Sequence, residues 1–187
     1  MSDVTFILQS IEKGNGQATT DLFPLVYTEL RRLAAGQMAG ERSDHTLSAT
    51  ALVHEAYVRL IDVNAASGWQ SRRHFFSAAA EAMRRILIEH ARRRQRIRRG
   101  GGRQRIAADD LVVELPADAD LLLDLDESLA CLAGEDPDVA ELVKLRLFAG
   151  LSTSEAGKLL GMSRRTAYRN WDYVRSWFAV RNGLADD

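Results

Sequence analysis

The fold is decided near the carboxyl end of the chain, by residues 150–171, which read GLSTSEAGKLLGMSRRTAYRNW. Ser152 and Glu155 have the spacing of a capping box, so we expect a helix to begin after Ser152. Gly161 can adopt the left-handed conformation that ends a helix, and Ser163 is a favourable cap for the next helix. The stretch therefore predicts two helices that meet across a tight turn.

The second of these helices is expected to have two different faces. Ala167, Trp171, Val174 and Phe178 recur at helical spacing and predict a buried stripe. The candidates for DNA contact lie at its amino-terminal end and on the other face: Ser163, Arg164, Arg165, Thr166, Tyr168 and Arg169. Cations in the first turn of a helix oppose its dipole, so stability does not explain two adjacent arginines there. Arginine can pair with guanine in the major groove, and we therefore interpret the stretch as a DNA-binding helix-turn-helix.

Helical spacing of apolar residues continues through most of the chain, with only three prolines and little β-branched alternation. We therefore predict an all-α protein made of two small helical domains joined by an acidic linker. The expected helices lie at about 5–13, 21–38, 50–61, 75 to just before 100, 121–132, 138–148, 153–160 and 164–178. The expected domain ranges are 1–99 and 121–187, with a flexible linker at 100–120.

Charge is segregated along the chain, although the net charge is only −1. Residues 72–106 contain twelve arginines and two glutamates, whereas residues 107–143 contain twelve acids and no lysine or arginine. The arginines at the end of the long helix point all around it, so this end should be solvated or meet an anion. A near-neutral total does not argue against nucleic-acid binding, because a local basic block supplies the attraction.

Several classes of protein are excluded by what the sequence lacks. No stretch approaches the roughly eighteen apolar residues of a membrane helix, and the amino terminus lacks the pattern of a secretory signal. A single cysteine, Cys131, fits a reducing cytoplasm, where we expect the protein to act without a membrane. His54 and Glu55 are not followed by a second histidine at Val58, as a zinc protease helix would require. We expect no catalytic residue, no metal ligand and no cofactor.

Three stretches resemble the extracytoplasmic-function (ECF) sigma factors of the sigma-70 family. They are TALVHEAYVRL at 50–60, the region 69–99 with its RRHFF and MRRIL segments, and SRRT with RNW within 163–171. The resemblance implies a bacterial RNA polymerase sigma factor that binds core polymerase, recognises promoter DNA and promotes transcription initiation. The implied partners are core RNA polymerase and promoter DNA, and an anti-sigma factor is left open as a third.

The resemblance also implies a role for each domain. In that family the first domain binds the polymerase clamp and melts DNA at the minus-ten element, and the second domain reads the minus-thirty-five element. The helix at 50–61 would bind polymerase through His54, Glu55 and Arg59. The commonest family pattern often has an acid at the place of Ala51 and a glutamine at that of His54, and this chain departs from it.

Melting needs surfaces that receive an unstacked base, together with cations for the separated strands. Trp69 is the best candidate for the base and Phe76 comes next, whereas Phe75 is expected in the core. The candidate cations are Arg72, Arg73, Arg84, Arg85, Arg92, Arg93 and Arg96.

The alternative function is that of a helix-turn-helix regulator that binds DNA without acting as a polymerase specificity subunit. Such a regulator would need a ligand pocket, a receiver or a dimer interface in its first domain. The sequence suggests none of these there.

Overall fold

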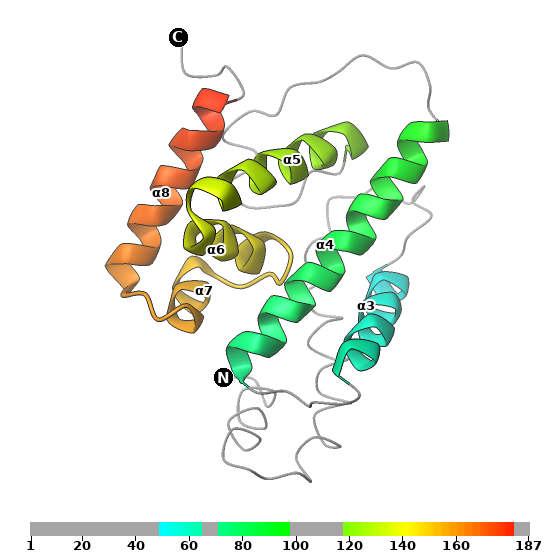
Figure 1. Cartoon of the computed structure of the whole chain (residues 1–187), viewed down its shortest axis with the longest axis horizontal. Coiled ribbons are helices and arrows are strands. Elements are labelled where there is room, and N and C mark those ends of the chain that lie inside the picture. Colours follow the sequence, from blue (N-terminus) through cyan, green and yellow to red (C-terminus); the bar gives the residue numbers. More distant parts are fainter. Residues whose placement is uncertain (1–48, 65–70, 98–117, 182–187) are drawn as a thin grey trace, which may run out of the picture.

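The computed structural model of the chain describes residues 49–64, 71–97 and 118–181. The helices predicted at about 5–13 and 21–38, Trp69, and the predicted linker up to residue 117 lie outside these ranges. Every regular element within them is an α-helix, which confirms the all-α prediction for this part of the chain (Figure 1). The helices are α3 (Ala49–Asn64), α4 (Arg72–Ile97), α5 (Ala119–Glu135), α6 (Pro137–Leu147), α7 (Thr153–Leu159) and α8 (Arg164–Arg181).

The first set of helices consists of α3 and α4, which pack against each other. The face predicted for the long helix is confirmed, because Phe75, Ala79, Met83 and Ile86 are all at most 1% exposed. The side chains that α3 buries are Leu52, Val53, Ala56 and Leu60. The pair is therefore held mainly by removal of apolar surface from water.

The second set begins with α5 and α6, whose ends are fixed by two aspartates. Asp118 caps α5 by accepting from the backbone N–H of Asp120 at 2.8 Å. Asp136 ends α5 through its own N–H and caps α6 by accepting from the N–H of Val139 at 3.0 Å. Pro137 follows as the first residue of α6, a position at which the missing amide hydrogen costs nothing. The chain thus reverses within one residue between the two helices.

The two sets of helices are in contact, since α4 packs against α5 and α6 as well as against α3 (Figure 1). Their buried hydrophobic side chains belong to one continuous cluster. Polar links also join them: Arg84 pairs with Asp126, and Gln95 Nε2 donates to Asp120 Oδ1 at 3.0 Å. The division of the chain into two domains remains a prediction.

Candidate nucleic-acid interface

The helix-turn-helix begins with the predicted capping box, which the structure confirms. The Ser152 hydroxyl accepts from the N–H of Glu155 at 3.2 Å, and the Glu155 carboxylate accepts from the N–H of Ser152 at 2.9 Å. Two backbone donors that the first turn of α7 would leave unpaired are satisfied in this way. The start of α7 is thereby fixed by side chains within four residues.

The turn between α7 and α8 depends on two glycines. Gly161 has a φ of +75°, the left-handed conformation predicted for it. A Cβ atom added at Gly157 would lie 2.4 Å from the Cβ of Ala167, so the two helices meet where α7 has no side chain. The N–H of Met162 donates to the carbonyl of Gly157 at 2.8 Å and closes the turn. These contacts set the angle at which α8 leaves α7.

The first turn of α8 is held by a serine cap, as the sequence predicted. The Ser163 hydroxyl accepts from the N–H of Thr166 at 3.1 Å and lies 2.8 Å from the Thr166 hydroxyl. Both residues were expected to contact DNA. In the structure each also contributes to the geometry of the helix start, so their hydroxyls position the neighbouring arginines.

The two predicted faces of α8 are confirmed. The buried face consists of Ala167, Trp171, Val174 and Phe178. The exposed residues at the amino-terminal end are Arg164, Arg165, Tyr168 and Arg169. The Arg164 guanidinium lies 5.6 Å from the centre of the Tyr168 ring, and this cation–π contact partly offsets the cost of a cation at a helix start. Three guanidinium groups and one phenol therefore share one accessible end of the helix.

The contact that joins α8 to α6 was not predicted from the sequence. The Arg146 guanidinium lies 4.4 Å from the centre of the Trp171 ring. Burial lowers the pKa of Arg146 below its usual value. No helical spacing relates the two residues, so only the folded chain reveals that Arg146 helps to fix the orientation of α8.

The three residues predicted to bind polymerase lie on α3 in different surroundings. His54 is exposed, whereas Glu55 and Arg59 are half-buried. Arg59 Nη2 lies 2.7 Å from Glu89 Oε2 on α4 and 3.0 Å from Glu55 Oε1. The hydrogen bond with Glu89 raises the pKa of Arg59, and the same bond lowers that of Glu89. Glu55 and Arg59 thus also tie α3 to α4, a role that the sequence did not indicate.

In the middle of α4, two candidate DNA-binding arginines share one glutamate. Arg84 and Arg85 donate to Glu81 at 3.1 and 2.8 Å, and Arg84 also pairs with Asp126 of α5. Burial raises the pKa of Glu81, but the hydrogen bonds from the two arginines outweigh it, so the pKa lies below its usual value. The hydrogen bond with Glu81 raises the pKa of Arg84. Arg84 is therefore engaged within the protein, whereas Arg85 is 65% exposed at its side chain.

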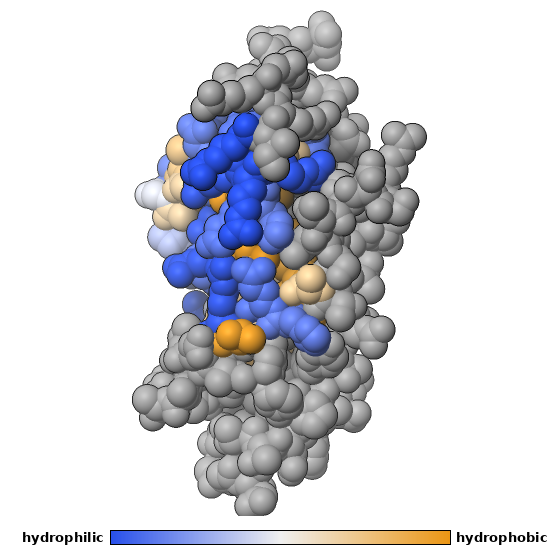
Figure 2. Space-filling view, turned by 90° about the vertical axis from the view of Figure 1, so that its right-hand side faces the viewer, coloured by the Kyte–Doolittle hydropathy of each residue, from blue (hydrophilic) through white to orange (hydrophobic). Residues whose placement is uncertain are grey.

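The carboxyl-terminal end of α4 presents the basic surface predicted from the arginine run. Its exposed arginines are Arg92, Arg93 and Arg96. Hydrophilic side chains dominate the described part of this side of the molecule (Figure 2). We call these three residues the arginine end of α4.

At the other end of α4, the predicted cations and the predicted base-stacking residue differ in exposure. Arg73 is exposed, and Arg72 lies over the Phe76 ring, 5.4 Å from its centre. Phe76 itself is only 2% exposed and packs edge to face on Phe75. Phe75 is in the core, as expected. The burial of Phe76 argues against it as a surface for an unstacked base in this conformation, because its ring is already covered by protein.

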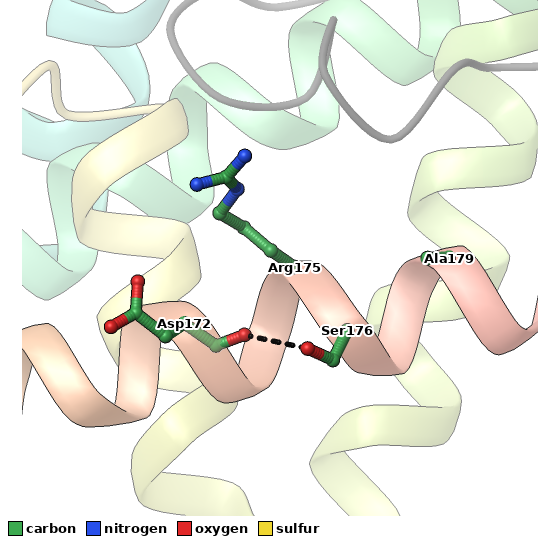
Figure 3. Close-up of a pocket in the computed structure, with 4 residues that line it drawn as sticks. All are labelled: Asp172, Arg175, Ser176 and Ala179. Carbon is green, nitrogen blue, oxygen red and sulfur yellow. Dashed lines mark hydrogen bonds between the residues drawn. The ribbon is translucent and has the colours of Figure 1, made fainter. Parts of the chain in front are cut away.

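One shallow pocket of about 290 Å³ lies on the outer side of α8 (Figure 3). Its described lining consists of Asp172, Arg175, Ser176 and Ala179. The Ser176 hydroxyl donates to the backbone carbonyl of Asp172 at 3.2 Å, a bond within the helix. These four residues include no nucleophile paired with a base, so this lining does not suggest catalysis.

The fold and its two exposed arginine clusters define a DNA-binding protein of the helix-turn-helix class. A comparison with known families then identifies the particular family. The sequence profile of the ECF sigma factor family matches residues 1–182, so the chain belongs to this family. It is therefore a sigma factor that binds core RNA polymerase and promoter DNA and acts in transcription initiation. This outcome confirms the resemblance and favours the sigma factor over the alternative regulator.

Curated proteins and solved structures gave no match to the chain. None of the helices in the described ranges is long and apolar enough to cross a membrane. Among the same residues, no group of three or more histidine, cysteine or acidic side chains is arranged to hold a metal ion. Members of the family are initiation factors rather than enzymes.

Proposed function

We propose that this sigma factor recognises the minus-thirty-five element through the amino-terminal end of α8. The observation that carries the proposal is the joint exposure of Arg164, Arg165, Tyr168 and Arg169 at that end. The opposite side of α8 is buried against its own domain, so only this side can enter a groove. Recognition helices of this class place their first turns against base edges in the major groove.

Within this surface, the arginines are suited to two kinds of contact. Arg164 and Arg165 lie in the first turn, where a guanidinium can pair bidentately with guanine. Arg169 lies one turn later, and a phosphate contact there would orient the helix without reading sequence. Ser163 and Thr166 contribute indirectly to recognition, because the hydrogen bond between them stabilises the first turn of α8, which carries the arginines.

The arginine end of α4 is proposed to contact the DNA strands at the minus-ten element. Each phosphate that Arg92, Arg93 or Arg96 neutralises would steepen the salt dependence of promoter binding. Arg72, Arg73 and Arg85 would extend this contact along α4. Trp69 remains our candidate for stacking on an unpaired base, which typically stabilises by about 1–3 kcal/mol.

The outer side of α3 is proposed to bind the polymerase clamp. His54 is exposed there, and Val58, one turn further along α3, is 55% exposed and adds an apolar side chain to this surface. Glu55 and Arg59 border this surface and fix its orientation relative to α4. An anti-sigma factor, if this protein has one, would have to cover this surface or the amino-terminal end of α8.

The decisive test uses the double variant Arg164→Ala/Arg165→Ala in promoter footprinting with core polymerase. We expect protection of the upstream element to be lost, whereas binding of the variant to core polymerase stays at the wild-type level. The binding free energy for the upstream element should fall by about 1–3 kcal/mol for each base contact removed.

Arg175→Ala is the matched control, because Arg175 is an exposed arginine of the same helix that lies farther from its amino-terminal end. It should retain upstream protection. Equal loss of core binding and upstream protection in the double variant, or an equal defect in Arg175→Ala, would contradict the role of the first turn.

A further inference from the structure

The exposed face of α8 carries one acid among arginines. Helix α8 contains five arginines, and Asp172 is its only acidic residue. Arg165, Arg169 and Asp172 follow one another at spacings of four and three residues, so they share one face of the helix. All three are exposed, and the buried stripe of α8 lies on the opposite face. Asp172 therefore belongs to the face that we propose enters the major groove.

The carboxylate of Asp172 has no role in holding the helix together. Among the described residues, no hydrogen bond or ion pair reaches it, although Arg169 and Arg175 lie three residues before and after it. The bond drawn in Figure 3 involves the backbone carbonyl of Asp172, which accepts from the Ser176 hydroxyl at 3.2 Å. Asp172 also lies in the third turn of α8, where the helix dipole no longer favours an acid. This carboxylate is thus available to a ligand.

The charge of Asp172 is the opposite of what a phosphate contact needs. A carboxylate repels the DNA backbone, so this residue weakens the sequence-independent attraction that the arginines around it supply. Proteins read sequence through the edges of the bases and not through the phosphates. An acid at this place is therefore suited to read a base, and it is unsuited to bind the backbone.

The hydrogen-bonding chemistry of a carboxylate favours one base over the other three. An ionised carboxylate can accept hydrogen bonds but cannot donate them. In the major groove, guanine and thymine present acceptors, and adenine presents an acceptor beside its amino group. Cytosine presents its N4 amino group without an acceptor beside it. The carboxylate would therefore pair best with cytosine.

We propose that Asp172 is a specificity-determining residue of this sigma factor and accepts a hydrogen bond from the N4 amino group of a cytosine in the upstream element. This proposal rests on the proposed binding of α8 to the minus-thirty-five element. With a rise of about 1.5 Å per residue, Asp172 lies about 10 Å along the helix axis from Arg165. Base pairs follow one another at about 3.4 Å, so Asp172 and the first-turn arginines can read different base pairs.

The test selects DNA with the full chain bound to core polymerase, from a pool of duplexes that are random over both promoter elements. The wild type should enrich cytosine at one upstream position by about fivefold, the low end for one base contact. Asp172→Asn should shift that position toward adenine, because an amide can pair with both N6 and N7 of adenine. Asp172→Ala should lose the preference there and keep it elsewhere. The control Glu127→Gln removes the same charge from an exposed acid of α5 and should select the wild-type sequence.

A base analogue tests the contact at the level of a single amino group. The selected cytosine is replaced by 2-pyrimidinone, which lacks that group. This replacement should weaken binding of the wild type about fivefold more than binding of Asp172→Ala. An equal effect on both proteins would overturn the proposal. So would an unchanged selected sequence in Asp172→Asn, whether or not that variant binds all duplexes more tightly.

These outcomes are distinct from failure of the proposed function. If Arg164→Ala/Arg165→Ala selects the same upstream sequence as the wild type, the proposed reading by the first turn of α8 is wrong, whatever Asp172→Asn shows. If that double variant loses the upstream sequence while Asp172→Asn selects it unchanged, α8 reads the element and only the role of Asp172 is wrong.

Discussion

At the scale of single residues, the helix-turn-helix depends on small side chains as much as on charged ones. Gly161 supplies a left-handed turn, and Gly157 leaves space for Ala167 of the next helix. The exposed arginines can be presented to DNA only because these residues let α8 approach α7. The glycines between α7 and α8 and the arginines at the start of α8 therefore belong to the same site.

Gly157→Ala should destabilise the protein by about 1–3 kcal/mol, the usual cost of overpacking a close contact. The added Cβ would lie 2.4 Å from that of Ala167, so α7 and α8 would have to separate. The free energy of unfolding from urea titration measures the effect. The matched control is Gly134→Ala in α5, where an added Cβ meets nothing within 4 Å. That substitution should be neutral or stabilise by up to about 1 kcal/mol, and a similar loss in both variants would contradict our account of the turn.

The residues that could be predicted from the sequence are those whose roles depend on near neighbours. Spacing alone predicted the capping box of Ser152 and Glu155, the left-handed conformation of Gly161 and the cap at Ser163. The structure confirms all three predictions. The contact of Arg146 with Trp171 could not be predicted, because it joins α6 to α8 and the whole of α7 lies between them in the sequence. Phe76 shows the same limit: spacing could not decide whether its ring faces the core or solvent.

At the scale of elements, α4 has three kinds of surface along its length. One face is buried against α3, the middle carries a network centred on Glu81, and the carboxyl-terminal end is exposed and basic. The sequence predicted the buried face and the basic end, since both follow from helical periodicity. The sequence did not predict the ion pair between Arg84 and Asp126, because 42 residues separate the two.

Glu81→Gln should reduce stability at neutral pH, by about 1 kcal/mol or less for a partly exposed network. The pKa of Glu81 is lowered in the folded protein, so the folded state favours the ionised carboxylate. That stabilisation is present above the unfolded pKa of about 4.3 and is lost as the pH falls through the lower folded value. We therefore expect the difference in the free energy of unfolding between wild type and variant to shrink as the pH falls. Urea titrations at pH 7 and at progressively lower pH measure this difference.

Glu127→Gln on α5 removes an exposed carboxylate and serves as the control for this titration. Its effect on stability should be small at each pH. A difference between wild type and Glu81→Gln that grows as the pH falls would contradict the assignment of Glu81 as a stabilising anion.

At the scale of the whole molecule, two basic surfaces lie on different parts of one packed structure. The amino-terminal end of α8 and the arginine end of α4 lie far apart, with α5 and α6 between the two helices (Figure 1). Family membership makes the chain a sigma factor, and we propose that each surface contacts one promoter element. The sequence indicated both surfaces, but it could not indicate that the two sets of helices pack together, because periodicity describes one helix at a time.

The most direct test of this account maps each surface onto DNA by local cleavage. Asp172→Cys on α8 and Gln95→Cys on α4, each with Cys131→Ser, would carry an iron chelate that cleaves nearby DNA in the polymerase–promoter complex. We predict cleavage around the minus-thirty-five element from position 172 and around the minus-ten element from position 95. Cleavage of the same element from both positions, or of the two elements in the reverse order, would contradict the account.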